Sequence, residues 1–267
     1  MIIGVFGANG MLGKYVSTYL AKAGHTVKNF NRADLDVAQF SEYEKLTELL
    51  NGLDAVVNCA GTIKPVANVQ PKERTFMVNS VWPNYLARTT HNLGIRCIHI
   101  TTDCVYTGKD GNYSELDSPD MFDDYGFSKS LGDAAGEYCR VFRTSIIGEE
   151  LRNKHSLVEW AKSQKGKEVK GFTNHRWNGL TCLQLAKNIE EELVSPDYSL
   201  GIVHLYSNAV NKFELLEILS DVFQLDLKIE AFEAGTACDR TLTSTIRPVQ
   251  FLTIREQVQQ LIGYLEQ

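Results

Sequence analysis

Several features are scarce or absent in this sequence of 267 residues, and each absence excludes a class of protein. No apolar run approaches the roughly 20 residues that a bilayer-spanning helix needs. With six prolines and no repeat or low-complexity tract, the chain offers no linker between independent domains. The opening MIIGVFGANG has no basic segment ahead of its apolar residues, so a signal peptide is not expected. We therefore expect a cytoplasmic protein that makes no use of a membrane.

Positive charge and clustered cysteines are scarce too. Lys and Arg number 27 against 33 Asp and Glu, so at a net charge of -6 no nucleic-acid partner is expected. The six cysteines form no CxxC pair and the histidine spacing supports no zinc site, so no metal is expected. We interpret the cysteines as buried, reduced thiols of a cytosolic protein.

What the chain does have is an alternation of short apolar runs and amphipathic segments. The predicted strands of the first part are 2–6, 25–30, 54–61, 96–103 and 140–148, and the predicted helices are 11–23, 71–93 and 125–139, with another around Leu46–Leu50. This rhythm predicts an α/β fold with a doubly wound parallel sheet of the Rossmann type.

Beyond residue 148 the alternation is less regular. Helices are expected at 154–164, 181–194, 212–224 and 255–265, and strands at 168–172 and 202–207. We predict a dinucleotide-binding Rossmann domain over 1–148. The remainder, 149–267, is expected to be mainly a smaller C-terminal substrate-binding lobe, with interleaved segments that return to the Rossmann core.

A glycine-rich turn lies between the first predicted strand and the first predicted helix. Gly7, Gly10 and Gly13 would permit the tight turn, the approach of a pyrophosphate and close helix packing, in that order. Met11 and Leu12 lie between the second and third glycines, where the helix N-terminus offers N–H groups to phosphate. The turn therefore predicts a bound dinucleotide.

Residues after the second and third strands bear on the choice of dinucleotide. An acidic residue after the second strand would favour NAD, whereas this chain has Asn31 and Arg32. Arg32 could pair with a 2′-phosphate, so NADP(H) is preferred and NAD(H) is the alternative. Cys59, Ala60 and Gly61 are small residues that would leave room for the cofactor's ribose and pyrophosphate.

The segment YGFSK places Tyr125 four residues before Lys129. On a helix this spacing puts both side chains on one face. We expect the ammonium to lower the pKa of the phenol, which would make Tyr125 a proton donor near neutral pH beside the bound dinucleotide. Both side chains are therefore also expected to contact the cofactor.

Taken together, these segments resemble the extended short-chain dehydrogenase/reductases over nearly the whole chain. The resemblance rests on GANGMLG (7–13), NCAG (58–61), TTDCVYTG (101–108), YGFSK (125–129) and FRTSIIG (142–148). Within that family, TTDCVYTGKDGNYSELD and YGFSKSLGD are similar to the dTDP-4-dehydrorhamnose reductases, which reduce a 4-keto-6-deoxy sugar carried on a nucleotide. The resemblance implies that Thr102, Tyr125 and Lys129 form the catalytic set.

The chemistry of these three side chains fits carbonyl reduction. Hydride attack on a carbonyl carbon leaves negative charge on the oxygen, which Tyr125 would protonate and Thr102 would stabilise by a hydrogen bond. Lys129 would bind the ribose hydroxyls on the nicotinamide side. We expect NADPH-dependent reduction of a nucleotide-linked 4-keto-6-deoxyhexose, in deoxysugar or polysaccharide biosynthesis such as that of dTDP-rhamnose.

Two alternatives remain open and a third is excluded. Sugar-nucleotide 4,6-dehydratases carry Asp-Glu after the corresponding Thr, but here Asp103 is followed by Cys104, a poor base toward carbon. An epimerase, or a combined epimerase and reductase, needs little beyond the same Tyr and Thr. A non-catalytic regulatory subunit is the other alternative, since the regulatory subunit of methionine adenosyltransferase resembles the same family.

The expected partner is a nucleotide sugar, and a homodimer is expected as well. The candidate substrate-binding residues are Thr102, Asp103, Val105, Asn174, Arg176, Trp177 and Arg247. Trp177 could stack on a base or sugar, and Arg176 or Arg247 could hold a diphosphate, with packing or a solvated charge as the competing interpretation. Ile146 and the segment GLT (179–181) depart from the subfamily pattern, which leaves the exact sugar open.

Overall fold

The centre of the molecule is a six-stranded parallel sheet. The computed structural model describes residues 1–150, 154, 156–247 and 252–266, without the side chains of residues 40, 42 and 43. The strands lie in the order β10-β5-β4-β3-β1-β2. Their bounds are β1 Ile2–Phe6, β2 Thr26–Phe30, β3 Ala55–Asn58, β4 Arg96–Thr102, β5 Arg140–Thr144 and β10 Gly201–His204. The predicted fold class, a doubly wound parallel sheet, is confirmed.

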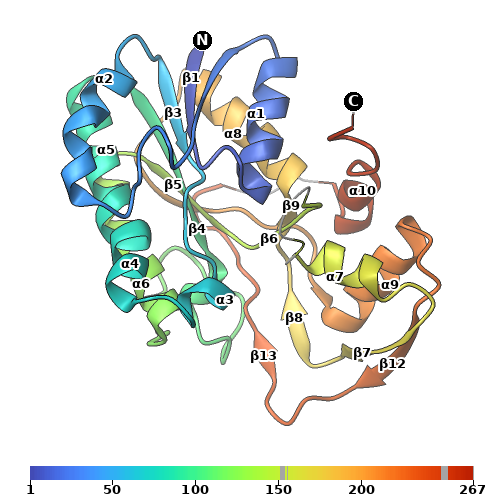
Figure 1. Cartoon of the computed structure of the whole chain (residues 1–267). Coiled ribbons are helices and arrows are strands. Elements are labelled where there is room, and N and C mark those ends of the chain that lie inside the picture. The colour runs from blue at the N-terminus through green and yellow to red at the C-terminus, as the bar shows by residue number, and fades with distance from the viewer. Residues whose placement is uncertain (151–153, 155, 248–251, 267) are drawn as a thin grey trace.

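Helices cover both faces of this sheet (Figure 1). Helices α1 (Met11–Lys22) and α8 (Cys182–Val194) contribute to one apolar cluster, and α2 (Leu46–Leu50) and α5 (Trp82–Asn92) to the other. Successive residues of β3 alternate between the two clusters, since Ala55 and Val57 belong to the first and Val56 to the second. Burial on both faces explains why β1 (IIGVF) and β3 (AVVN) are nearly continuous apolar runs in the sequence.

Two of the predicted helices are interrupted. The segment predicted as one helix over 71–93 consists of α4 (Lys72–Phe76), a π turn η2 (Met77–Val81) and α5. The segment predicted over 125–139 is α6 (Asp124–Gly132) followed by the 3-10 helix η4 (Asp133–Glu137). Short helices η1 (Phe40–Lys45), α3 (Lys64–Ala67) and η3 (Asp103–Val105) fill the connections after β2, β3 and β4.

The rest of the chain forms a second layer of small elements below the sheet in Figure 1. Strands β7 (Glu168–Phe172) and β12 (Lys228–Phe232) pair, and β8 (His175–Trp177) lies between β11 (Val210–Asn211) and β13 (Cys238–Asp239). Strands β6 (Ile146–Ile147) and β9 (Leu180–Thr181) form another pair. Helices α7 (Leu157–Ser163), α9 (Lys212–Val222) and α10 (Ile254–Gln259) share a third apolar cluster with this layer.

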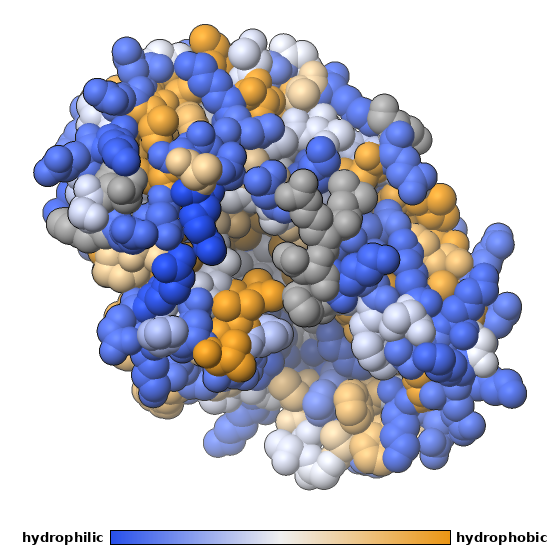
Figure 2. Space-filling model, viewed as in Figure 1, coloured by the Kyte–Doolittle hydropathy of each residue, from blue (hydrophilic) through white to orange (hydrophobic). Residues whose placement is uncertain are grey.

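The elements that the sequence did not predict are mostly those of this second layer. Strands β8, β9, β11 and β13 each have two or three residues, too few to show an alternating pattern, whereas β6 is the end of the strand predicted at 140–148, which the structure divides after Thr144. Strand β12 is longer but alternates partly buried with exposed positions at the edge of a two-stranded sheet. Figure 2 shows the surface hollowed between the two parts of the molecule. No helix in the described ranges is long and apolar enough to cross a bilayer.

Candidate functional site

The glycine turn after β1 is built as tightly as its sequence predicts. Gly7 has a positive φ of 75° and its N–H donates to Phe30 O at 3.1 Å. A Cβ on Gly13 would lie 2.2 Å from Gly7 O, so a side chain there is excluded. Gly10 is the N-cap of α1 and has no side chain that could accept from the N–H groups of the first turn, which have no acceptor within the helix itself. These donors, next to Met11 and Leu12, fit the pyrophosphate of a dinucleotide.

The end of β2 lies beside this turn because of the bond between Gly7 and Phe30. Asn31 is occupied locally, since its side-chain oxygen accepts from Ala33 N at 2.9 Å and its N–H donates to Asp34. Arg32 is exposed at the same end of the strand. Its guanidinium therefore lies where it can approach a group bound at the turn.

The segment after β3 connects the glycine turn to the lysine of YGFSK. Cys59 N donates to Phe6 O at 2.9 Å, and a Cβ on Gly7 would lie 2.7 Å from Ala60 N. A Cβ on Gly61 would lie 2.7 Å from Lys129 Nζ. The backbone of Cys59, Ala60 and Gly61 therefore spans the distance between the two motifs.

Thr102 and Tyr125 meet at the carboxyl end of β4. Thr102 is the last residue of β4, its Oγ1 accepts from Cys104 N at 3.2 Å and it donates to Asp103 Oδ1 at 3.2 Å. The Thr102 side chain lies close enough to Tyr125 to lower the pKa of the phenol. Asp123 is the N-cap of α6, where it accepts from Gly126 N at 2.7 Å, and this orients the first turn that carries Tyr125.

The pKa of Tyr125 departs from the prediction. Burial raises this pKa, the charges of Cys104, Asp103 and Asp123 raise it further, and the Thr102 hydroxyl opposes them. Lys129 is not among the groups that shift it in the described part of the chain. The predicted lowering by the ammonium is therefore wrong, because desolvation of the phenol dominates.

Lys129 is buried, with 7% of its surface exposed. Burial lowers its pKa to about 8, and the charge of Asp133, one turn further along, works in the opposite direction. Asp133 is held in turn by a buried ion pair with Arg143, with 2.5 Å between Asp133 Oδ2 and the guanidinium. Arg143 donates to Tyr106 Oη at 2.7 Å. Lys129 is thus influenced by a carboxylate whose position is fixed by Arg143.

Asn79, in the π turn, joins the loop after β3 to α6. Its Oδ1 accepts from Thr62 N at 2.8 Å, and its Nδ2 donates to Thr62 O and to Ser128 Oγ at 3.1 Å. The side chain is fully buried. Asn79 therefore bonds directly to Thr62 and Ser128, the residues next to Gly61 and Lys129 in the chain.

The remaining predicted substrate residues are separated by the fold. Asp103 is 4% exposed and burial raises its pKa, while Val105 is buried. Asn174 is committed to a turn, exchanging two hydrogen bonds with Ala234. Trp177 is buried in the third apolar cluster, 4% exposed, with Lys212 Nζ 5.1 Å from its ring centroid.

The two predicted diphosphate arginines have carboxylate partners. Exposed Arg176 lies 3.6 Å from Asp239. Arg247 pairs with Glu191 and Glu192 on α8, and Glu192 also holds Arg140. Arg140 is level with Ile98 in β4, four residues before Thr102 and hence about 13 Å along the strand. Arg247 is therefore not brought to the group around Thr102.

Two cations near that group were not identified from the sequence. Arg240 donates to Tyr106 O at 2.8 Å and to Cys104 Sγ at 3.8 Å, and its charge and that of Lys212 both lower the pKa of Asp103. No sequence motif marks either residue, because each reaches the site from a segment more than a hundred residues after Thr102.

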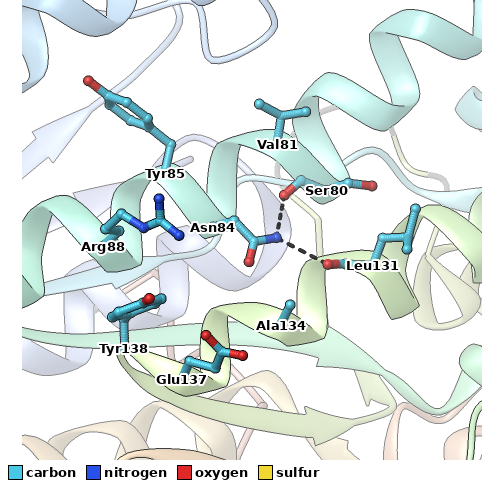
Figure 3. A pocket seen from close by; sticks show the side chains of 9 residues that line it. All are labelled: Ser80, Val81, Asn84, Tyr85, Arg88, Leu131, Ala134, Glu137 and Tyr138. Carbon is cyan, nitrogen blue, oxygen red and sulfur yellow. Dashed lines mark hydrogen bonds between the residues drawn. The ribbon is translucent and has the colours of Figure 1, made fainter.

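Two further observations define the surroundings. Within residues that the structure describes, no group of three or more His, Cys, Asp or Glu side chains is placed to hold a metal ion. A hollow of about 450 Å³ lies on the outer side of α5 and η4, where Asn84 bonds Ser80 O and Leu131 O (Figure 3). It is lined from the outer sides of these helices and is separate from the group around Thr102.

The strand order, the glycine turn and the Thr-Tyr-Lys group define an extended short-chain dehydrogenase/reductase, as the sequence resemblance implied. Residues 1–221 match the family model described as the RmlD substrate binding domain, and the chain belongs to that family.

Curated relatives match over part of their length. A probable low-salt glycan biosynthesis reductase of Haloferax volcanii is 33% identical over 49% of this chain and 47% of that protein. The dTDP-4-dehydrorhamnose reductase of Escherichia coli is 28% identical over 78% of this chain and 73% of that protein. The chain thus spans less than half of the length of the first of these relatives.

Among solved structures, the dTDP-4-dehydrorhamnose reductase of Bacillus anthracis in complex with NADP has a TM-score of 0.82. It is 17% identical and covers 98% of both chains. At this identity the similarity establishes the fold.

Proposed function

We propose that this chain catalyses the NADPH-dependent reduction of a nucleotide-linked 4-keto-6-deoxyhexose. The observation that carries the proposal is the placement of the Thr102 hydroxyl, at the carboxyl end of β4, close enough to Tyr125 to lower the pKa of its phenol. Ligands of open α/β sheets bind at that end of the strands. The reductase names of the relatives support the same chemistry.

In this proposal each side chain has one task. NADPH, when bound, supplies hydride to the carbonyl carbon. Tyr125 Oη donates its proton to the carbonyl oxygen, and the raised pKa keeps the phenol protonated at neutral pH until negative charge develops there. Thr102 Oγ1 stabilises the same oxygen by a hydrogen bond. The buried Lys129 ammonium holds ribose hydroxyls beside Gly61.

The cofactor is proposed to be NADP(H), with NAD(H) as the weaker alternative. The first turn of α1 (Gly10, Met11, Leu12) would bind the pyrophosphate. Arg32 would pair with the 2′-phosphate, while Asn31 shapes the turn that presents it. The NADP complex of the structurally similar Bacillus anthracis reductase is consistent with this choice.

The remaining parts of the proposal concern organisation. We propose that residues 1–148 form the cofactor domain and that 149–267 supply mainly the substrate lobe, with interleaved segments that return to the Rossmann core. The positions of α8 and β10 in the core of the sheet support the interleaved part of this proposal. Asp103 and Val105 would contact the sugar. The roles of Asn174, Arg176, Trp177 and Arg247 stay predictions, as do the homodimer and the cytoplasmic location.

The test is NADPH oxidation against dTDP-, UDP- and GDP-linked 4-keto-6-deoxy sugars. We expect one equivalent of NADPH to be consumed per sugar reduced, and Tyr125→Phe to lose turnover by at least about 100-fold while NADPH still binds. Product formation without net NADPH consumption would favour the epimerase. Binding of both ligands without turnover would favour the regulatory subunit.

A further inference from the structure

Lys212 is placed where a lysine is costly. It is the first residue of α9, so its charge lies at the positive end of the helix dipole. Burial lowers its pKa, and its Nζ lies 5.1 Å from the centroid of the Trp177 ring. No carboxylate forms an ion pair with it among the residues that the structure describes. A cation kept in such a position fits an anionic ligand better than a structural role.

Arg240 approaches the same place from another segment. Its Nε donates to Tyr106 O at 2.8 Å, and its remaining nitrogens reach Thr107 O at 3.4 Å and Cys104 Sγ at 3.8 Å. These contacts fix the guanidinium beside η3, the turn that directly follows Thr102. The Arg240 guanidinium is therefore held near the hydroxyls of Thr102 and Tyr125.

The positive charge of Lys212 and Arg240 exceeds the negative charge of the carboxyl beside them. Both act on Asp103, the buried carboxyl between them and Thr102. Two other carboxylates nearby already have cation partners: Asp123 pairs with Lys64 at 2.6 Å, and Asp239 pairs with Arg176 at 3.6 Å. Asp103 is then left to balance both Lys212 and Arg240, and a bound anion would neutralise the excess positive charge. The residues come from the sheet domain, from α9 and from the segment after β13, so an anion there would bridge both parts of the molecule.

We propose that Lys212 and Arg240 form an anion subsite beside Asp103 and Cys104 that binds the diphosphate of the nucleotide sugar. This inference rests on the proposed function and deepens it by assigning the diphosphate-binding residues. In a pyranose the anomeric carbon, which carries the diphosphate, lies across the ring from C4. If the C4 carbonyl lies at Thr102 and Tyr125, the diphosphate on C1 lies on the opposite side of the sugar ring, where Lys212 and Arg240 could bind it. Of the candidates from sequence, Arg176 is paired with Asp239, directly before Arg240, and Arg247 is held away from this place by Glu191 and Glu192 on α8.

The direct test is calorimetric binding of dTDP, UDP and inorganic pyrophosphate to the NADP⁺-loaded full chain. Lys212→Met and Arg240→Gln should each raise the Kd of the diphosphate that binds most tightly by about tenfold or more, the loss of one charged contact. Lys212→Arg keeps the charge and should stay within a few-fold of the native protein. The NADPH Kd should not change in any of them, which also shows that the variants are folded.

The chain offers matched controls in the same layer. Lys170 Nζ lies 4.4 Å from the centroid of the Phe232 ring, so Lys170→Met removes a comparable lysine from an aromatic face. Arg255 pairs with Asp221 on the surface, so Arg255→Gln removes a comparable guanidinium. Both controls should leave diphosphate binding within about twofold of the native value, which corresponds to a few tenths of a kcal/mol.

Three results would overturn the inference. One is unchanged diphosphate affinity in Lys212→Met and Arg240→Gln, and another is an equal loss in the two controls. The third is a loss of affinity for glucuronate, a sugar acid without phosphate, in Lys212→Met and Arg240→Gln while pyrophosphate and the nucleoside diphosphates bind normally. The two cations would then bind the carboxylate of a sugar and not a diphosphate. Because binding is measured without turnover, failure of reductase activity would refute the proposed function and leave this result standing.

Discussion

Asn79 Nδ2 donates a hydrogen bond to Ser128 Oγ at 3.1 Å, which joins the π turn before α5 to the helix that carries Tyr125 and Lys129. The same amide binds both backbone groups of Thr62. A π turn places one extra residue in a helix and re-aims its side chains, and such turns are frequent at functional sites. Here it directs Asn79 into the space between the loop after β3 and α6.

Asn79→Ala should reduce both stability and turnover. It leaves the buried Thr62 N–H and Thr62 O without their partner, which should lower the free energy of unfolding by about 1–3 kcal/mol. A displaced Lys129 should lower kcat by roughly tenfold to a hundredfold. Denaturant unfolding and steady-state kinetics measure the two effects.

Asn84→Ala is the control for Asn79. Asn84 also joins α5 to α6, through Ser80 O and Leu131 O, but on the outer side of the helices (Figure 3). Its loss should leave kcat unchanged. Equal kinetic losses in both variants would mean that general helix packing, and not the position of Asn79, matters for turnover.

Arg32→Ala should change cofactor preference. Loss of one charge-assisted contact to the 2′-phosphate should weaken NADPH binding by about tenfold to a hundredfold, whereas NADH, which lacks that phosphate, should bind as before. Fluorescence titration with both cofactors measures this. Arg88→Ala, at the exposed face of α5, is the control and should change neither value. Equal losses for NADPH and NADH would contradict the assignment.

The alkaline limb of the pH profile should report Lys129. Its pKa of about 8 means that the ammonium is lost as pH rises through that value, so kcat/KM should fall above pH 8. Asp133→Asn removes the charge that raises this pKa, so the limb should move to lower pH. A limb that stays in place would show that another group titrates there.

The lowered pKa of Lys129 should also make the free energy of unfolding depend on pH. The pKa of Lys129 is about 8 in the folded chain and about 10.4 in an unfolded one, so between these values the unfolded state binds more protons. The contribution of Lys129 to the free energy of unfolding should therefore rise with pH across that window. Chemical unfolding at pH 8 and pH 10 of the native chain and of Lys129→Met isolates it, and only the native chain should show this increment.

Gly61→Ala should affect the site more than the fold. The added Cβ would lie 2.7 Å from Lys129 Nζ, the flexible end of a side chain, which can move aside. We expect a small change in the free energy of unfolding, about 0.5 kcal/mol, and at least a tenfold loss in kcat/KM. Gly235→Ala, where nothing lies within 4 Å of the added atom, should change neither. Native kinetics in Gly61→Ala would contradict the placement of Lys129 beside residue 61.

The parts of the structure that the sequence predicted are those with a local pattern. The glycine turn at residues 7–13 and the strands of the sheet depend on spacing within a few residues, and burial on both faces makes β1 and β3 readable as apolar runs. Tyr125 and Lys129 could be paired from their spacing on α6. Their roles stay predictions until kinetics test them.

Other features depended on the surroundings of a residue. The pKa of Tyr125 is raised and not lowered, because desolvation is set by everything packed around the phenol and not by one neighbour on its helix. Arg176 and Arg247 were both candidates for the diphosphate from the sequence, and only the fold shows their carboxylate partners.

The sequence by itself determined the strands of the sheet, the glycine turn and the position of Tyr125 and Lys129 on one helix, since each follows from a local pattern. Only the tertiary structure decided that Lys212 and Arg240 lie beside Asp103 and that Asn79 supports Lys129. Those contacts join segments distant in the chain, and local periodicity carries no information about which distant segments pack together.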